Sequence, residues 1–142
     1  MAETLVLDTS ACFALLEDEA GADKVESCLL AASEGGVTIH VSFVTLAEVE
    51  YVITQERGAT DASLALAKIK AWPIHCLHSD EALCGDAAKL KAAHKISLAD
   101  AFVAATAMRF DATLVHKDPE FSALTGIVKQ EMLPPKPSAR GS

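Results

Sequence analysis

Basic residues are in the minority in this chain, and aromatic residues are scarce. Its 142 residues contain 12 lysines and arginines against 20 aspartates and glutamates, which gives a formal net charge of −8. A protein that holds nucleic acid on a broad basic face has the opposite balance. The composition therefore argues against a simple electrostatic nucleic-acid binder. It remains compatible with a site where divalent cations neutralise the charge, or with a partner that supplies basic residues.

Long apolar runs are also missing. No stretch of about 18 uninterrupted apolar residues is present, so we expect no membrane span. The N-terminal sequence MAETLVLD lacks a basic region, and Glu3 and Asp8 interrupt its apolar run. We therefore expect no signal peptide.

The cysteines do not form a CxxC pair. Cys12, Cys28, Cys76 and Cys84 are widely spread and stand in apolar surroundings, as in ACFALL and ESCLLAA. This pattern predicts reduced, buried thiols in a cytoplasmic protein, and it argues against a disulfide framework or a zinc site.

The length suits one domain with a substantial core. The chain is 51% hydrophobic but only 5% aromatic, and alanine is prominent, which is typical of helices packed closely on a sheet. We expect a single domain over residues 1–133. Residues 134–142, PPKPSARGS, are rich in proline and serine and are expected to be disordered.

Segments with strand character alternate with helical segments along the chain. The expected strands cover residues 4–8, 37–44, 74–78, 112–116 and 126–133; the expected helices cover residues 10–19, 21–35, 45–58, 61–72, 79–94 (capped by Ser79), 97–111 and, briefly, 119–124. This alternation predicts an α/β fold, a three-layer α/β/α sandwich with a central parallel sheet of four to five strands. In such folds the functional crevice lies beyond the carboxyl ends of the strands.

Four acids are placed to reach that crevice. Asp8 follows the first strand and Asp118 lies just past the fourth, so both emerge at the same edge of the sheet. Glu48 stands in the first turns of the helix after the second strand. Asp100 begins the helix that leads into the fourth strand, and it reaches the edge if that helix starts above the sheet.

A cluster of four carboxylates needs compensation. Two unit charges about 4 Å apart repel by roughly 4 kcal/mol at an effective dielectric constant of 20. Such a cluster either raises its pKa values or binds hard divalent cations, for which carboxylate oxygens are preferred ligands. One or two Mg²⁺ or Mn²⁺ ions held in this way suit the hydrolysis of a phosphodiester.

Each acid also has a purely structural explanation. Asp8 can cap the first helix, and Asp118 before Pro119 is a good N-cap with proline at the first helical position. Asp100 can be an early-turn acid favoured by the helix dipole, and Glu48 a solvated helix residue. These alternatives lose force together only if the four side chains converge.

Four motifs appear in order along the chain: VLDTSA, TLAEVEY, ISLADAFVAATA and TLVHKDPEF. As an ordered set they resemble the PIN domain, specifically the small single-domain type of the VapC toxins of bacterial and archaeal toxin–antitoxin pairs. The resemblance covers residues 4–133. It implies a parallel-sheet α/β/α fold and a Mg²⁺- or Mn²⁺-dependent endoribonuclease that leaves 5′-phosphate ends. By motif position it implies an acidic site of Asp8, Glu48, Asp100 and Asp118.

Residues beside the motif acids are further candidates. The resemblance implies a hydroxyl next to the first acid, here Thr9 or Ser10, that orients a ligand or a metal-bound water. Ser97 matches a small polar residue before the third acid, and we interpret it as the helix cap. His116 stands where many members have Thr or Ser; it either contacts a phosphate or a neighbouring carboxylate, or is a surface histidine without a role. Lys117 flanks the site, and we expect a weak contact with the RNA backbone.

The resemblance also implies partners. It predicts an RNA substrate, an antitoxin protein that blocks the crevice with a basic side chain, and a homodimer, for which residues 27–32 and 46–53 serve either as interface or as core. A PIN-fold binding module without catalysis is the alternative function. A receiver domain or a haloacid-dehalogenase phosphatase is disfavoured, because the first strand is followed by DTS without a second acid.

Overall fold

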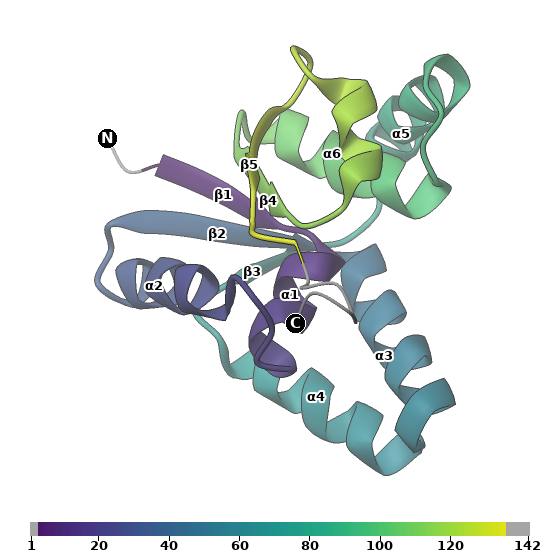
Figure 1. The fold of residues 1–142 in the computed structure, drawn as a ribbon. Helices are drawn as coiled ribbons and strands as arrows, with labels where there is room; N and C mark the ends of the chain where they lie inside the picture. The colour runs from purple at the N-terminus through teal and green to yellow at the C-terminus, as the bar shows by residue number, and fades with distance from the viewer. Residues whose placement is uncertain (1–2, 136–142) are drawn as a thin grey trace.

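A five-stranded sheet forms the centre of the computed structural model, which describes residues 3–135 (Figure 1). All its strand pairs are parallel and the strand order is β3-β2-β1-β4-β5. The strands are β1 (Glu3–Leu7), β2 (Val37–Ser42), β3 (His75–Leu77), β4 (Thr113–His116) and β5 (Lys129–Met132). The predicted parallel sheet is confirmed. The expectation for residues 136–142 lies outside the described residues.

Helices cover both faces of the sheet, which confirms the three-layer architecture (Figure 1). One layer contains α1 (Thr9–Leu16), α2 (Ala22–Ser33), α3 (Phe43–Arg57) and α4 (Ala59–Ala71); the other contains α5 (Glu81–Ala93), α6 (Leu98–Arg109) and the 3-10 turn η1 (Pro119–Leu124). None of the helices formed by residues 3–135 is long and apolar enough to cross a membrane.

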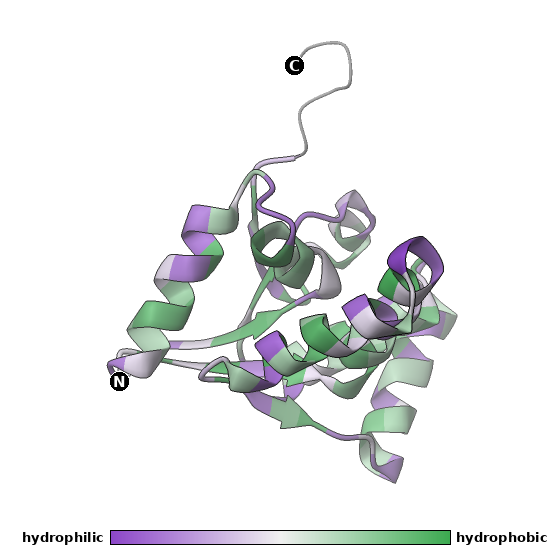
Figure 2. Ribbon diagram, turned by 90° about the horizontal axis from the view of Figure 1, so that it is seen from below, coloured by the Kyte–Doolittle hydropathy of each residue, from purple (hydrophilic) through white to green (hydrophobic). Residues whose placement is uncertain are grey.

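The strands supply side chains to two separate cores. Leu5 and Leu7 of β1 pack with the layer of α1 to α4, whereas Val6 packs with α5, α6 and η1. On β4, Val115 and Leu114 divide in the same way. Successive side chains of a strand point to opposite faces, so a sheet covered on both sides needs continuous apolar runs. Figure 2 shows these hydrophobic strands inside helices whose outer faces carry the hydrophilic residues.

The second strand is shorter than predicted. Phe43 and Val44 were expected to continue it, but they form the first turn of α3. Ser42 is the N-cap, and its hydroxyl oxygen accepts a hydrogen bond from the Val44 N–H at 3.3 Å. The capping signal of this serine therefore decides where the helix begins, against the strand preference of the two apolar residues after it.

The N-cap of α5 is Asp80 and not Ser79, so the predicted cap was wrong by one residue. Asp80 accepts a hydrogen bond from the Leu83 N–H at 2.8 Å. It also binds Arg109 through both guanidinium nitrogens, at 2.9 and 3.0 Å. These hydrogen bonds from Arg109 hold the pKa of Asp80 at about 2. The carboxylate can serve the helix and the arginine together, which a serine hydroxyl cannot.

The four cysteines are free, as predicted, but they are not all buried. Cys12 and Cys28 lie in the core, Cys76 is half-buried and Cys84 is exposed. The buried residues of α5 are Leu83, Ala87 and Leu90, and Cys84 falls outside this stripe. The predicted burial of Cys84 was therefore wrong, because its local sequence does not show which face of the helix is covered.

Candidate acidic metal site

The carboxyl ends of β1 and β4 meet at one edge of the sheet, and the acids gather there. Asp8 directly follows β1, and its N–H donates to Val115 O of β4 at 3.0 Å. Asp118 lies just beyond β4 as the N-cap of η1. Glu48 reaches the same edge from the second turn of α3, and Asp100 from the first turn of α6. The structure thus brings the four predicted acids together.

Asp8 is buried and only half satisfied. Its Oδ2 accepts hydrogen bonds from the backbone N–H and the hydroxyl of Ser10, at 3.1 and 2.6 Å, which caps α1. Its Oδ1 is buried without a hydrogen-bond partner among the described residues. Burial raises the pKa of Asp8 to about 6, with a contribution from the charge of Glu48 and against the hydrogen bonds from Ser10. A buried carboxylate oxygen without a partner is unfavourable unless a donor or cation reaches it.

Asp100 is the most strongly perturbed acid of the cluster. Its backbone N–H donates to the Ser97 hydroxyl oxygen at 3.0 Å, which confirms Ser97 as the helix cap. Burial raises the pKa of its carboxyl well above the usual range. The charge of Asp8 and side-chain hydrogen bonds with Glu120 and Asp118 add to this. A hydrogen bond between two carboxyl groups requires a proton on one of them. Asp100 is therefore the acid of this cluster that keeps its proton to the highest pH.

Glu120 belongs to the cluster but was missed from the sequence. Its N–H donates to Asp118 Oδ1 at 2.9 Å, and its carboxylate accepts a hydrogen bond from the Ser97 N–H and joins Asp100. The segment PEF was interpreted only as the start of a short helix. The signal was present in the DPE sequence, because a second acid in the first turn after a capping aspartate stays near the same sheet edge.

Thr9 positions the acid of the neighbouring helix. Its hydroxyl donates to Glu48 Oε1 at 2.6 Å and lies 3.1 Å from the buried hydroxyl of Thr45. This contact joins the start of α1 to α3. Thr9 thus fixes the orientation of Glu48.

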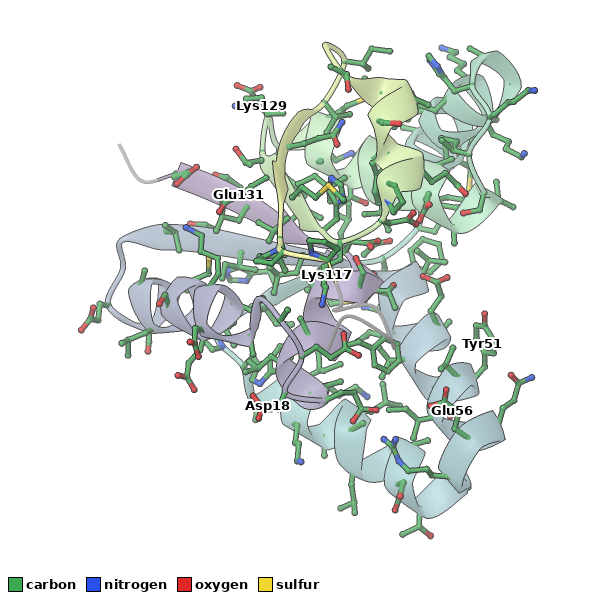
Figure 3. All side chains as sticks on the ribbon, in the orientation of Figure 1. Asp18, Tyr51, Glu56, Lys117, Lys129 and Glu131 are labelled. Carbon is green, nitrogen blue, oxygen red and sulfur yellow. The ribbon has the colours of Figure 1, made fainter. Side chains whose placement is uncertain are left out.

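Ser10 links the first acid to the strand that carries the last one. Its hydroxyl group donates to Asp8 Oδ2, and its oxygen accepts a hydrogen bond from the Lys117 N–H at 2.9 Å. The Lys117 side chain is 6% exposed, and its ammonium donates to Ala20 O at 2.7 Å and lies 3.4 Å from Glu19. Lys117 lies beside α1 in Figure 3. Its contact with RNA stays a prediction.

His116 is buried, so the alternative of a surface histidine was wrong. Its Nδ1 accepts a hydrogen bond from the Asp118 N–H at 3.1 Å, and its Nε2 lies 2.9 Å from Gln130 Oε1. Burial lowers the pKa of the imidazole. The physical reason is that β4 lies between β1 and β5, so its last residue is still covered by the sheet and by η1.

The sequence model of the PIN domain family matches residues 5–127. The chain belongs to the PIN domain family. Among curated protein sequences, none matches it.

Solved structures with the same fold share little sequence with this PIN domain. VapBC2 from Rickettsia felis, bound to a DNA fragment from its promoter, has a TM-score of 0.73 at 20% identity, over 92% of this chain and 99% of that chain. DNA-bound VapBC from Salmonella typhimurium has a TM-score of 0.70 at 18% identity, over 93% and 98%. VapC20 from Mycobacterium tuberculosis, described as a sarcin-ricin loop cleaving toxin, has a TM-score of 0.67 at 20% identity, over 84% and 93%. At these identities the likeness shows the fold.

The donor set of the PIN-domain cluster fits a hard divalent cation. Within residues 3–135, no three His, Cys, Asp or Glu side chains are already arranged to hold a metal ion. The unpartnered Asp8 Oδ1 is the observation that fits a cation, since it is a hard oxygen ligand. Asp8, Asp100 and Asp118 are the residues that could hold one, with Glu48 and Glu120 beside them.

A groove opens next to the acidic cluster, between α1 and α3. Its volume is about 480 Å³, and its lining residues are Ser10, Phe13, Glu17, Glu19, Val52, Glu56, Lys117 and Pro135. Phe13 and Val52 give it an apolar surface, and glutamates surround them. Ser10 is shared with the acidic site, so the groove leads toward Asp8.

Proposed function

We propose that this PIN domain is a divalent-cation-dependent endoribonuclease and the toxin of a type II toxin–antitoxin pair. The observation that carries the proposal is the gathering of Asp8, Asp100 and Asp118 at one sheet edge, with Asp8 Oδ1 buried and unpartnered. Such a set is unfavourable without a cation and becomes favourable with one. Helix capping accounts for Asp8 Oδ2 and for Asp118, but it gives no reason for the buried, unpartnered Asp8 Oδ1.

In the proposed mechanism the acids divide the work. Asp8, Asp100 and Asp118 would hold Mg²⁺ or Mn²⁺, directly or through water, and Glu48 would either share a cation or position the attacking water. A bound cation of this kind activates water and stabilises the leaving oxygen of a phosphodiester. Ser10 orients Asp8, and Thr9 orients Glu48. Glu120 extends the acidic set on the side of Asp100.

The descriptions of the similar solved structures support RNA as the substrate and an antitoxin as the partner. The Mycobacterium tuberculosis neighbour is described as a toxin that cleaves the sarcin-ricin loop, and other neighbours are VapBC assemblies. The groove suits a partner segment with an apolar face and basic side chains, because Phe13 and Val52 lie among Glu17 and Glu56. Such a segment would reach the acidic site past Ser10.

A homodimer stays a prediction. In the two segments proposed as interface or core, Val49 and Ile53 lie in the core. Leu30 and Tyr51 are exposed, at 61% and 53% of their surface, and are free to contact a second copy. Tyr51 lies on the outer side of α3 (Figure 3).

Cleavage of RNA with and without Mg²⁺ or Mn²⁺ tests the proposal. We expect the parent protein to cleave only with the cation and to leave 5′-phosphate ends, and we expect Asp8→Asn to lose the activity. Asn keeps the N-cap acceptor, so α1 should survive. Asp23→Asn, at an exposed acid of α2, is the matched control and should cleave like the parent. Cleavage in EDTA, or by Asp8→Asn at the parental rate, would contradict the nuclease. A folded protein that binds an antitoxin but cleaves no RNA would point to the non-catalytic module.

A further inference from the structure

Two side chains outside the acidic cluster form hydrogen bonds with both ends of the turn of residues 118–121, which carries Asp118 and Glu120. His116 is the last residue of β4, and Gln130 lies on the neighbouring edge strand β5. We propose that His116 and Gln130 act as a pair of positioning residues that fixes this turn for cation binding. The inference rests on the proposed nuclease function and deepens it, because no feature of the acidic site itself assigns a role to β5.

The sheet register brings the two side chains together. Gln130 pairs with Leu114 in the parallel ladder, and residues 114 and 116 point to the same face of β4. Both side chains therefore face η1. His116 Nε2 lies 2.9 Å from Gln130 Oε1, and Gln130 Nε2 donates to Phe121 O at 2.9 Å. At the other end, the Asp118 N–H donates to His116 Nδ1 at 3.1 Å.

Only one form of the histidine satisfies these hydrogen bonds together. The backbone N–H of Asp118 can only donate, so Nδ1 must carry a lone pair. The proton of the neutral ring then lies on Nε2 and points at Gln130 Oε1. This leaves the Gln130 amide nitrogen to donate to the carbonyl of Phe121, as the structure shows. Hydrogen-bond donation therefore runs in one direction, from the Asp118 N–H through the imidazole and the Gln130 amide to the carbonyl of Phe121.

The turn so bracketed contains the two acids. Asp118 and Phe121 are its anchored ends, and Glu120 lies between them with its N–H on Asp118 Oδ1. The imidazole also packs against the buried Phe121 ring, with centroids 4.8 Å apart. Groups that orient metal-binding carboxylates affect metal affinity or activity by roughly 10- to 100-fold. In this chain His116 stands at the position where the family resemblance implies a hydroxyl.

The test uses Gln130→Leu, which removes both amide hydrogen bonds while keeping the size of the side chain. We expect Mn²⁺ affinity, measured by electron paramagnetic resonance on the folded protein, to fall by about tenfold or more. Glu131→Gln is the matched control on the same strand, because it removes only the exposed ion pair with Lys24 and should bind like the parent. His116→Ala should lose about as much as Gln130→Leu, and the double variant no more than the larger single loss.

The outcomes separate this inference from the proposed function. If the parent protein binds no Mn²⁺, the proposed nuclease function is contradicted. If the parent binds Mn²⁺ but Gln130→Leu binds it with the same affinity, the positioning role of His116 and Gln130 is contradicted. Nitrogen NMR of His116 in the parent protein is a second test, which needs neither a bound cation nor a substitution. We expect the Nε2–H tautomer, because the Asp118 N–H needs a lone pair on Nδ1. A parental Nδ1–H tautomer would overturn the pair.

Discussion

The side chains of Asp100 and Asp118 are hydrogen-bonded to each other, although one lies in the first turn of α6 and the other caps η1 beyond the end of β4. Two carboxyl groups can share a hydrogen bond only when one of them keeps its proton. The elements that converge on the sheet edge therefore place the acids closer than their ionised forms tolerate. Ionising these clustered acids costs free energy. The stability of the protein should therefore depend on pH, on bound cations and on substitutions that remove a charge.

Without cations, the free energy of unfolding should fall as the pH rises from 5 to 7. Burial raises the pKa of Asp8 from 3.8 to about 6, so in this range the folded state binds more protons than the unfolded chain. The stability attributable to Asp8 is greatest below pH 4 and is lost as the pH passes the folded pKa. Its full loss amounts to about 3 kcal/mol. Asp100 changes stability in the same direction, and its loss extends to higher pH.

Thermal unfolding at pH 5 and pH 7, with and without Mn²⁺, measures this effect. The cation should raise the melting temperature more at pH 7 than at pH 5, because protons compete with it for the carboxylates. Asp80 does not interfere, since its pKa of about 2 keeps it ionised throughout. The lowered pKa values of His40 and His116 make stability rise with pH over the same range, so the loss from Asp8 is measured against Asp8→Asn. A parent whose melting temperature changes with pH as that of Asp8→Asn does would contradict the assigned cause.

Asp100→Asn should stabilise the cation-free protein while abolishing cleavage. The Asn amide can donate to Asp118 and Glu120 as the protonated acid does, but it carries no charge at any pH. The cap of α6 is retained, because Ser97 binds the backbone of residue 100. We expect a gain of about 1–2 kcal/mol at pH 7, as is typical when a strained functional site is relieved.

Urea unfolding of Asp100→Asn without cations gives the measurement. Asp86→Asn, at an exposed acid of α5, is the control and should change stability by less than about 0.5 kcal/mol. A destabilised Asp100→Asn would mean that the ionised aspartate already has favourable partners in the folded protein.

The sequence was sufficient for the sheet and for most of the acidic set. Strand and helix periods predicted the parallel α/β architecture, and a parallel sheet places the carboxyl ends of β1 and β4, with Asp8 and Asp118, at the same edge. The strand order then makes the two strands neighbours. The position of Asp100 needed the structure, because only the packing of α6 decides whether its first turn lies above the sheet edge.

Glu120 and His116 show what local sequence does not contain. Whether an acid in a short turn faces solvent or another acid depends on residues distant in the chain, here Ser97 and Asp100. Whether the last residue of a strand is buried depends on its neighbours in the sheet. The covering of His116 by β5 and η1 is a property of the strand order, which the alternation of elements does not determine.

Ser10→Ala should weaken cation binding through Asp8. The serine hydroxyl donates to Asp8 Oδ2 and accepts the Lys117 N–H, so the substitution leaves two buried polar groups with fewer partners. The hydrogen bonds from Ser10 lower the pKa of Asp8, so losing the hydroxyl raises it further. We expect a loss of stability of about 1–3 kcal/mol and weaker Mn²⁺ binding at pH 6. Calorimetric titration measures the binding.

Ser63→Ala is the control for that substitution, because Ser63 is exposed on α4. It should leave both quantities unchanged. Parental Mn²⁺ affinity in Ser10→Ala would show that Asp8 needs no help from this hydroxyl.

Lys117→Met should destabilise the fold without changing how RNA binding depends on salt. The ammonium is already engaged by Ala20 O and Glu19, at 6% side-chain exposure, so it is directed to the connection between α1 and α2. Met keeps the apolar stem, and we expect the free energy of unfolding to fall by about 1–3 kcal/mol because the partners of the ammonium are left behind.

A lysine that neutralised an RNA phosphate would instead contribute about 0.7 to the slope of log affinity against log salt. Binding of a short single-stranded RNA to Asp100→Asn protein, with and without Lys117→Met, distinguishes the two, and the exposed Lys95→Met is the control. A slope reduced only by Lys117→Met would restore the RNA contact expected from the sequence, and would mean that Lys117 leaves Glu19 when RNA binds.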